Sequence, residues 1–218
     1  MTVKSVVVAL GLLASAGLAA GAQSKSSKAA AKPAPAPANL HLTVAPVGNE
    51  ARYRVREVLA GHEMENEAVG VTDSIRGNLV VQPNGTIVSD SSLFVVNIAV
   101  LKSDQKRRDA YIKENTLHTD KYPTVQIVPK SFVGLTARPS QTPVAFQMIG
   151  DLTIEGVTHP TTWDVSAHAQ GNDIVGTAKT QFLFSDFAME KPHRAVVFSV
   201  TDTVKLEYDF HLTQVPPQ

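Results

Sequence analysis

The sequence contains no cysteine among its 218 residues. This absence excludes a disulfide-stapled scaffold and any zinc or iron–sulfur site with cysteine ligands. Aromatic residues make up only 6% of the chain, and 20 Lys and Arg side chains balance 20 Asp and Glu side chains. Such a chain has neither the basic field nor the stacking surface of a general nucleic-acid binder. We therefore expect no nucleic-acid partner.

The first 22 residues have the three parts of a secretory signal peptide. Lys4 supplies the positive charge, residues 6–20 form an apolar run of fifteen, and Ala20-Gly21-Ala22 is a small-x-small cleavage site. A transmembrane anchor is the alternative, but such a span needs about 20 apolar residues. We expect residues 1–22 to be removed, which leaves a periplasmic or secreted protein without a stable membrane span.

Residues 23–39 form a segment of Lys, Ser, Ala and Pro with no acidic side chain and no large apolar one. Such a segment cannot bury enough surface to offset its ordering entropy, so we expect a disordered linker. After residue 39, the 20 acidic side chains face 16 basic ones. We expect one mildly acidic folded domain over residues 40–214 and a short tail over 215–218.

The domain is dominated by the period-two alternation of apolar and polar residues that is typical of β-strands. Asn84-Gly85 is a strong hairpin signal, because both residues accept a positive φ at low cost. One charged segment, residues 103–115, predicts a short helix with Ser103 as its N-cap. Many short strands and one helix favour a closed barrel or a sandwich, and composition does not choose between them. The expected strands are residues 40–44, 51–56, 75–81, 87–100, 124–128, 144–149, 152–154, 161–169, 174–184 and 195–212.

Three arginines, Arg52, Arg54 and Arg56, share one face of the second expected strand, with Glu50 and Glu57 nearby. A nucleic-acid platform would need a basic domain and interleaved exposed aromatic rings. Cross-strand ion pairing fits an acidic domain better, and we expect it here.

Two long motifs resemble those of the YceI-like family. Residues 107–129 (RRDAYIKENTLHTDKYPTVQIVP) are similar to the family segment in which an Arg-Asp-Ala helix precedes a Lys-Tyr-Pro strand start. Residues 150–165 (GDLTIEGVTHPTTWDV) resemble the second family motif, and residues 182–189 (FLFSDFAM) resemble a third, weaker one. The resemblance implies an all-β fold, an eight-stranded antiparallel lipocalin-like barrel with one short surface helix. It also implies an exported protein that holds a long isoprenoid or similar amphiphile inside the barrel.

A site of that kind needs an apolar and aromatic lining with a few polar groups at its mouth. An isoprenoid diphosphate would also bind cationic side chains at the mouth, whereas a neutral quinone would need none. For every candidate, plain core packing or solvated surface charge is the alternative. The candidate lining residues are Tyr53, Val55, Phe94, Val96, Phe146, Met148, Phe182, Phe184, Phe187, Met189, Phe198 and Tyr208. The candidate head-group residues are Arg107, Arg108, Lys191, His193 and Arg194.

Local motifs for catalysis or metal binding are weak in this sequence. His62-Glu63 begins like a zinc-protease helix, but Asn66 stands where the second histidine would be needed. Neither a G-x-S-x-G elbow nor a glycine-rich phosphate loop occurs. We therefore expect no enzyme, no metal and no cofactor. An acid–base set built from distant segments, such as Asp186 with His193, stays open.

Taken together, these features predict an exported, non-enzymatic binding or carrier protein for a long-chain apolar amphiphile, such as an isoprenoid or a quinone. One alternative is a packed barrel that acts as a structural or interaction module without a ligand. Another is a hydrolase or isomerase that acts on a lipid-like substrate. The sequence does not fix the oligomeric state, and a homodimer stays open.

Overall fold

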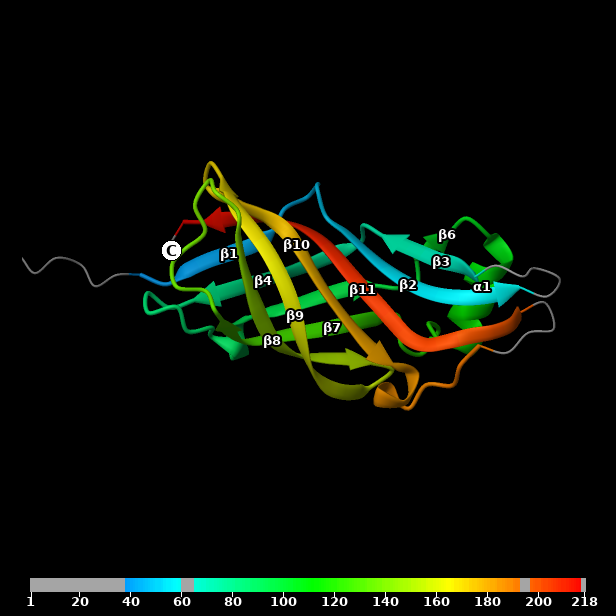
Figure 1. Cartoon of the computed structure of the whole chain (residues 1–218). Helices are drawn as coiled ribbons and strands as arrows, with labels where there is room; N and C mark the ends of the chain where they lie inside the picture. Colours follow the sequence, from blue (N-terminus) through cyan, green and yellow to red (C-terminus); the bar gives the residue numbers. More distant parts are fainter. Residues whose placement is uncertain (1–37, 60–64, 193–196, 217–218) are drawn as a thin grey trace, which may run out of the picture. The chain divides into compact units, whose positions relative to one another are not determined.

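A computed structural model of the chain describes residues 38–59, 65–192 and 197–216. The expected signal peptide and almost all of the expected linker lie outside these residues. The described chain is mostly β-strand (Figure 1), with one α-helix, α1 (Lys106–Asn115), and two 3-10 helices, η1 (Ser89–Ser91) and η2 (Phe184–Phe187). The strands are β1 (Leu40–Val44), β2 (Glu50–Leu59), β3 (Glu65–Thr72), β4 (Ile75–Val81), β5 (Leu93–Asn97), β6 (Lys102–Ser103), β7 (Thr124–Val133), β8 (Val144–Ile154), β9 (Val157–Gln170), β10 (Asp173–Leu183) and β11 (Val197–Val215).

Eight of these strands close into a ring. Hydrogen-bonded neighbours follow the order β1, β4, β5, β7, β8, β9, β10 and β11, and β11 returns to β1. The closure pairs residues 41–44 with residues 212–215, and it is antiparallel like every other pairing around the ring. A ring of this size has an interior wide enough for packed side chains or one small ligand. The expected eight-stranded antiparallel barrel is confirmed.

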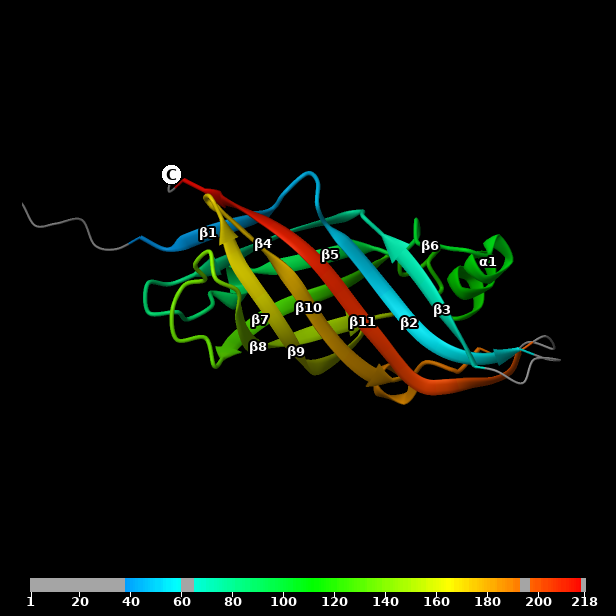
Figure 2. The same cartoon turned by 45° about the horizontal axis from the view of Figure 1, so that its top comes forward.

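β11 is long enough to pair with two strands along one edge. Its residues 212–215 pair with β1, and its residues 197–209 pair with β2. β2 pairs with β3, and β3 pairs with β6. These three strands therefore extend one wall of the barrel beyond β1, β4 and β5. Figures 1 and 2 show this extension beside α1, at the end opposite the start of β1.

The arginines of β2 make ion pairs with neighbouring strands. Arg54 Nε lies 3.1 Å from a carboxylate oxygen of Glu207 on β11, and its Nη1 lies 3.0 Å from Glu67 on β3. Arg52 Nη1 lies 3.5 Å from Glu207, and Arg52 also pairs with Asp209. The expected cross-strand ion pairing is confirmed for Arg52 and Arg54.

The helix α1 begins at Lys106, two residues later than an N-cap at Ser103 predicted. Ser103 cannot be its N-cap, because Ser103 belongs to β6 and pairs with Gly70. Gln105 takes the N-cap position instead, without a side-chain hydrogen bond. The carboxylate of Asp109 accepts hydrogen bonds from the backbone N–H of Ser103, at 2.9 Å, and from its hydroxyl, at 2.5 Å. The first turn of α1 is therefore tied to the strand before it.

Several strand boundaries also differ from the expected ones. The expected segments 144–149 and 152–154 are one strand, β8, whereas the expected strand 87–100 contains only η1 and β5. The turn between β8 and β9 lies at Glu155-Gly156, where both residues have positive φ. Pro160 is within β9, opposite Asp151 of β8. The strand β3 was not predicted.

Candidate functional site

The barrel interior contains two apolar cavities of similar size. We call the one beneath α1 the proximal chamber, with a volume of about 430 Å³. We call the one where β1 begins the distal chamber, with a volume of about 460 Å³. Both volumes fall in the range of small-molecule sites in proteins.

The proximal chamber has an apolar interior and a polar mouth. Inward side chains of β2, β5, β8, β10 and β11 form the interior, because alternate residues of a strand face the same side. The helix α1 contributes Arg107, Arg108, Tyr111 and Ile112, and Glu57 of β2 lies among the lining residues. The apolar lining includes Val55, Val96, Ile98, Leu101, Ile154, Phe182, Phe184 and Val204.

A buried ion pair joins α1 to β2 at this mouth. Arg108 Nη2 donates to Glu57 Oε1 at 2.9 Å, while Nη1 pairs with Asp104 one turn earlier. The side chains of Arg108 and Glu57 are only 11% and 9% exposed. Burial alone would lower the pKa of Arg108, but the two carboxylates outweigh burial and raise this pKa. Arg108 therefore stays cationic, and its charge is already matched within the protein.

Tyr53 places an unusual polar group beside the proximal chamber. Its hydroxyl is buried and has no hydrogen-bond partner among the described residues. Burial raises the pKa of Tyr53 to about 12. The positive charge of Arg108 lowers this pKa, whereas the carboxylates of Asp109, Glu57 and Asp104 raise it further. The ring fits because Gly70 faces it across the β2–β3 pair: a Cβ at Gly70 would lie 2.2 Å from Tyr53 Cε1. The hydroxyl is thus a neutral donor without a partner in the described part of the chain.

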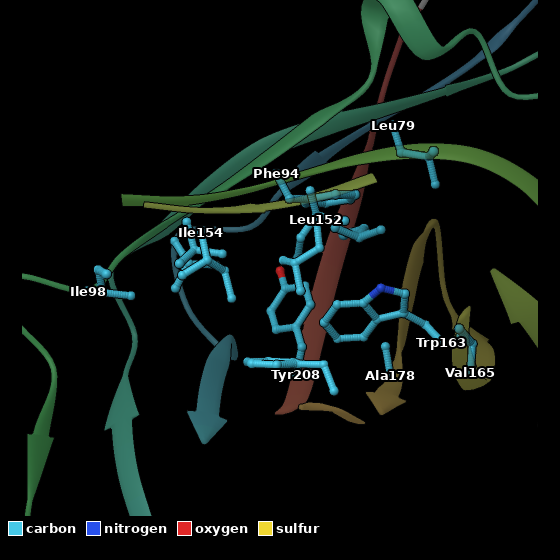
Figure 3. Close-up of a cluster of buried hydrophobic side chains, with 14 of the residues drawn as sticks. Leu79, Phe94, Ile98, Leu152, Ile154, Trp163, Val165, Ala178 and Tyr208 are labelled. Carbon is cyan, nitrogen blue, oxygen red and sulfur yellow. The ribbon is translucent and has the colours of Figure 1, made fainter. Parts of the chain in front are cut away.

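Three buried residues, Ile127, Trp163 and Tyr208, line both chambers, and we call them the waist. Figure 3 shows the rings of Trp163 and Tyr208 side by side within the core. Trp163 Nε1 donates to Thr161 Oγ1 at 2.8 Å, and the Tyr208 hydroxyl donates to Asn49 Oδ1 at 2.9 Å. Both rings therefore have their polar atoms satisfied, which holds them in place between the chambers.

The distal chamber is lined by aliphatic and aromatic side chains. Phe132 and Phe146 meet edge to face, with ring centroids 5.4 Å apart. Arg138 is the one charged residue among the described residues that line it. Its Nη2 donates to Gln214 Oε1 at 2.8 Å. Other apolar lining residues are Leu40, Leu42, Leu79, Phe94, Met148, Val165 and Phe210.

The candidate lining and head-group residues predicted from the sequence lie at different places in the structure. Six lining candidates are at the proximal chamber with Arg107 and Arg108, namely Tyr53, Val55, Val96, Phe182, Phe184 and Met189. Phe94, Phe146 and Met148 are at the distal chamber, and Tyr208 belongs to both.

The remaining candidates lie elsewhere. Phe187 lines neither chamber and packs against Phe182, with ring centroids 4.7 Å apart. Lys191 also lines neither chamber, and its Nζ lies 4.0 Å from Asp202. His193 and Arg194 are outside the described residues, as is the side chain of Phe198.

Trp163, the single tryptophan of the chain, was not among the predicted lining residues. The alternation along β9 could have found it, because Thr161, Trp163, Val165 and Ala167 are all buried while the residues between them are exposed. Leu117, which follows α1 and lines the proximal chamber, was not predicted either.

The described residues give no metal centre. No group of three or more His, Asp or Glu side chains among them could hold a metal ion. Asp186 accepts a hydrogen bond from the backbone N–H of Leu183, whereas His62 and His193 lie outside the described residues. In the same part of the chain, the helices are too short or too polar to cross a membrane.

Comparisons with known proteins agree with this fold. The family model of the YceI-like domain matches residues 42–212. No curated protein matches the chain.

Solved structures of low sequence identity share the architecture. A polyisoprenoid binding domain from Saccharophagus degradans, implicated in plant cell wall breakdown, has a TM-score of 0.62 at 10% identity; the match covers 81% of this chain and 99% of that domain. BcnA from Burkholderia cenocepacia has a TM-score of 0.56 at 15% identity, covering 75% and 94% of the two chains. The YceI protein of Campylobacter jejuni has a TM-score of 0.53 at 16% identity, covering 68% and 85%.

Proposed function

Because this chain belongs to the YceI-like family, we propose that it is an exported, non-enzymatic carrier of a long apolar amphiphile such as an isoprenoid or a quinone. The observation that carries this proposal is the proximal chamber, where an apolar cavity of about 430 Å³ opens beneath a polar helix. The fold shared with a polyisoprenoid binding domain supports the same ligand class.

The ligand chain would occupy the interior of the proximal chamber. Each Å² of apolar surface removed from water contributes about 25 cal/mol, so a chain of a few isoprene units gains substantial free energy there. The residues proposed to contact it are Tyr53, Val55, Val96, Phe182, Phe184, Met189 and the waist residue Tyr208.

The polar head would lie at the mouth, close to α1. Arg107 is exposed there, whereas the charge of Arg108 is matched by Glu57 and Asp104. Arg107 is thus the cation of α1 better placed to meet an anionic head, and Arg108 positions the helix. A neutral carbonyl head would need no cation.

Export of the protein rests on its N-terminal sequence. Cleavage after residue 22 would release a chain whose residues 23–39 form a solvated linker ahead of the barrel. The carrier would then work in the periplasm or outside the cell, where the apolar chain of the ligand must be shielded from water.

Native mass spectrometry of the purified mature protein, followed by lipid extraction, tests the proposal. We expect a co-purifying chain-like ligand and saturable binding of at least one of polyprenyl phosphates, quinones or fatty amides. Ala68, a 4% exposed residue of the proximal lining, provides the variant: Ala68→Leu fills part of the chamber and should weaken this binding. Val133→Leu, on an exposed strand position, is the matched control. Absence of ligand together with absence of saturable binding would refute the carrier proposal.

A further inference from the structure

We propose that the outer face of α1 and the turn before β6 form a docking surface for an anionic lipid bilayer. This inference goes beyond the proposed function, which concerns the interior of the barrel and not the partner that its outside meets. It rests on the proposed function in one respect, because an amphiphile of the proposed class partitions into membranes. The charge of this surface, an exposed apolar side chain within it and its position at the barrel mouth carry the inference.

Charge is distributed unevenly over the folded domain. Residues 102–115, which contain β6 and α1, carry five Lys and Arg side chains against three Asp and Glu side chains. The whole domain after residue 39 carries 16 basic side chains against 20 acidic ones. A basic segment on an otherwise acidic domain attracts an anionic surface in a preferred orientation.

The outer face of α1 presents cations to solvent. Lys106, Arg107, Ala110 and Glu114 are exposed and Lys113 is half-buried, at the spacing of one helix face. None of the three cations of this face forms an ion pair with another described residue. Their charges are therefore available to an external partner.

The inner side of α1 is held to the barrel, which keeps the outer face turned outward. Arg108 pairs with the buried Glu57 of β2 at 2.9 Å, and Asp109 accepts hydrogen bonds from Ser103 of β6. The helix thus presents its cations on a fixed support.

The turn before β6 adds an apolar side chain to this surface. Val100 is 44% exposed, and Lys102 two residues later is also exposed. β6 lies next to α1 in both views (Figures 1 and 2). Cations beside an exposed apolar group suit a lipid interface, because the cations meet anionic head groups while the apolar group enters the acyl boundary. We call the outer face of α1 with Val100 and Lys102 the docking surface.

The docking surface lies at the mouth of the proximal chamber. The same helix lines that mouth with Arg108, Tyr111 and Ile112. A bilayer bound to α1 would therefore lie beside the opening through which an amphiphile enters. An acidic protein would also match the charge, but Val100 and the neighbouring mouth favour the bilayer.

Co-sedimentation of the purified mature protein with lipid vesicles tests the proposal. One set of vesicles contains phosphatidylcholine and phosphatidylglycerol, and the other contains phosphatidylcholine alone. We expect saturable binding to the anionic vesicles, weakened by added salt, and much weaker binding to the neutral ones. Equal binding to both kinds of vesicle, or no binding to the anionic ones at low salt, would overturn the proposal.

Two pairs of exposed cations give matched variants. Lys102→Gln with Lys106→Gln removes two charges from the docking surface, whereas Arg76→Gln with Lys205→Gln removes two from exposed positions of β4 and β11. The first pair should weaken binding to anionic vesicles by about 25-fold, since each cation near an anionic surface contributes about fivefold. The second pair should weaken it by less than about threefold. Equal weakening by both pairs would overturn the proposal, and the three Lys of residues 23–39 are the same in both.

Two valines of similar exposure test the apolar contribution. Val100 is 44% exposed and Val133, at the end of β7, is 48% exposed. Val100→Ser should weaken vesicle binding by about threefold or more, whereas Val133→Ser should leave it within about twofold. Equal effects of the two substitutions would show that Val100 does not enter the bilayer.

The outcomes separate the docking surface from the carrier proposal and from a protein partner. Vesicle binding that depends on Lys102 and Lys106, in a protein that binds no amphiphile, would refute the carrier and support the docking surface. Amphiphile binding without vesicle binding would overturn the docking surface and leave the carrier standing. Poly-L-glutamate represents an acidic protein, and binding to it without binding to anionic vesicles would overturn the bilayer as the partner.

Discussion

Arg108 Nη2 lies 2.9 Å from Glu57 Oε1, and this contact joins α1 to β2 across the mouth of the proximal chamber. Removing the cation leaves a buried carboxylate without its charge partner. We expect Arg108→Ala to lower the free energy of unfolding by about 3 kcal/mol, because an uncompensated buried charge is costly. Urea unfolding at neutral pH measures this loss.

The neighbouring Arg107 is the control for that prediction. It is exposed at the same mouth, so Arg107→Ala should change the free energy of unfolding by less than about 0.5 kcal/mol. The double variant Glu57→Ala with Arg108→Ala should lose less stability than the sum of the two single variants. Equal losses from Arg107→Ala and Arg108→Ala would contradict the role given to the ion pair.

Two tyrosines with buried hydroxyls differ in whether those hydroxyls are hydrogen-bonded. The Tyr53 hydroxyl lacks a partner among the described residues, whereas the Tyr208 hydroxyl donates to Asn49 at 2.9 Å. In delipidated protein, Tyr53→Phe should leave stability unchanged or raise it by up to about 1 kcal/mol, and Tyr208→Phe should cost about 1–2 kcal/mol. Thermal or urea unfolding measures the stability of both variants. A larger loss of stability for Tyr53→Phe than for Tyr208→Phe would contradict the hydrogen bonding described for the two hydroxyls.

We expect a glycine at position 70 to be required for stability, because the Tyr53 ring lies opposite it. A Cβ there would lie 2.2 Å from Tyr53 Cε1, so Gly70→Ala should cost about 1–3 kcal/mol. In the Tyr53→Leu background, where a smaller side chain replaces the ring, Gly70→Ala should cost less.

Gly176 is the matched comparison for this test. Its Cβ would lie 2.1 Å from the backbone oxygen of Ser166, which no side-chain change can move. Gly176→Ala should therefore keep its full cost in the Tyr53→Leu background. Urea unfolding of the two pairs of variants measures the difference, and equal relief at both glycines would show that the Tyr53 ring is not the obstacle.

The ion pairs of Glu207 predict acid sensitivity. Burial alone would raise the pKa of this carboxyl, but Arg54, Lys179 and Arg52 outweigh burial and hold it below its ordinary value of 4.5. A carboxyl with a lowered pKa in the folded state stabilises the protein above its unfolded pKa and loses that contribution as the pH falls. Stability should therefore drop between pH 4.5 and the lowered pKa, by up to about 1 kcal/mol for a partly exposed pair.

Glu207→Gln should remove this part of the acid-side slope while leaving the rest of the pH profile in place. Stability measured by urea unfolding from pH 3 to pH 7, at low and at high salt, tests it. Identical slopes in the wild type and the variant would argue against the ion pairs as the source.

The alternation of residues predicted that the domain is built of strands, and the family resemblance supplied the closed barrel. Neither predicted how the interior is divided. β1 and β4 match the expected strands at 40–44 and 75–81. The start of α1 was missed because Ser103, a good cap by type, is held in a strand pair that only the tertiary fold creates.

The division of the interior into two chambers could not be predicted from the sequence, for a geometric reason. Phe94 and Val96 share one face of β5, yet Phe94 lines the distal chamber and Val96 the proximal one. The boundary between them is set by Trp163 and Tyr208, which come from β9 and β11 on other parts of the ring. Alternation reports which residues point inward, but the space left between them depends on all eight strands together.

The pairing of β1 with β11 also has a consequence for how the protein folds. The first and last strands of the ring pair with each other, because residues 41–44 of β1 pair with residues 212–215 of β11. The ring therefore cannot close before the last strand has been made. Such a fold has a high contact order, and loop-closure entropy opposes the final pairing. A chain emerging from a ribosome or a translocation pore cannot close this barrel until nearly all of it has been released. Folding should therefore be a late and comparatively slow event, and truncation before residue 212 should leave the ring open.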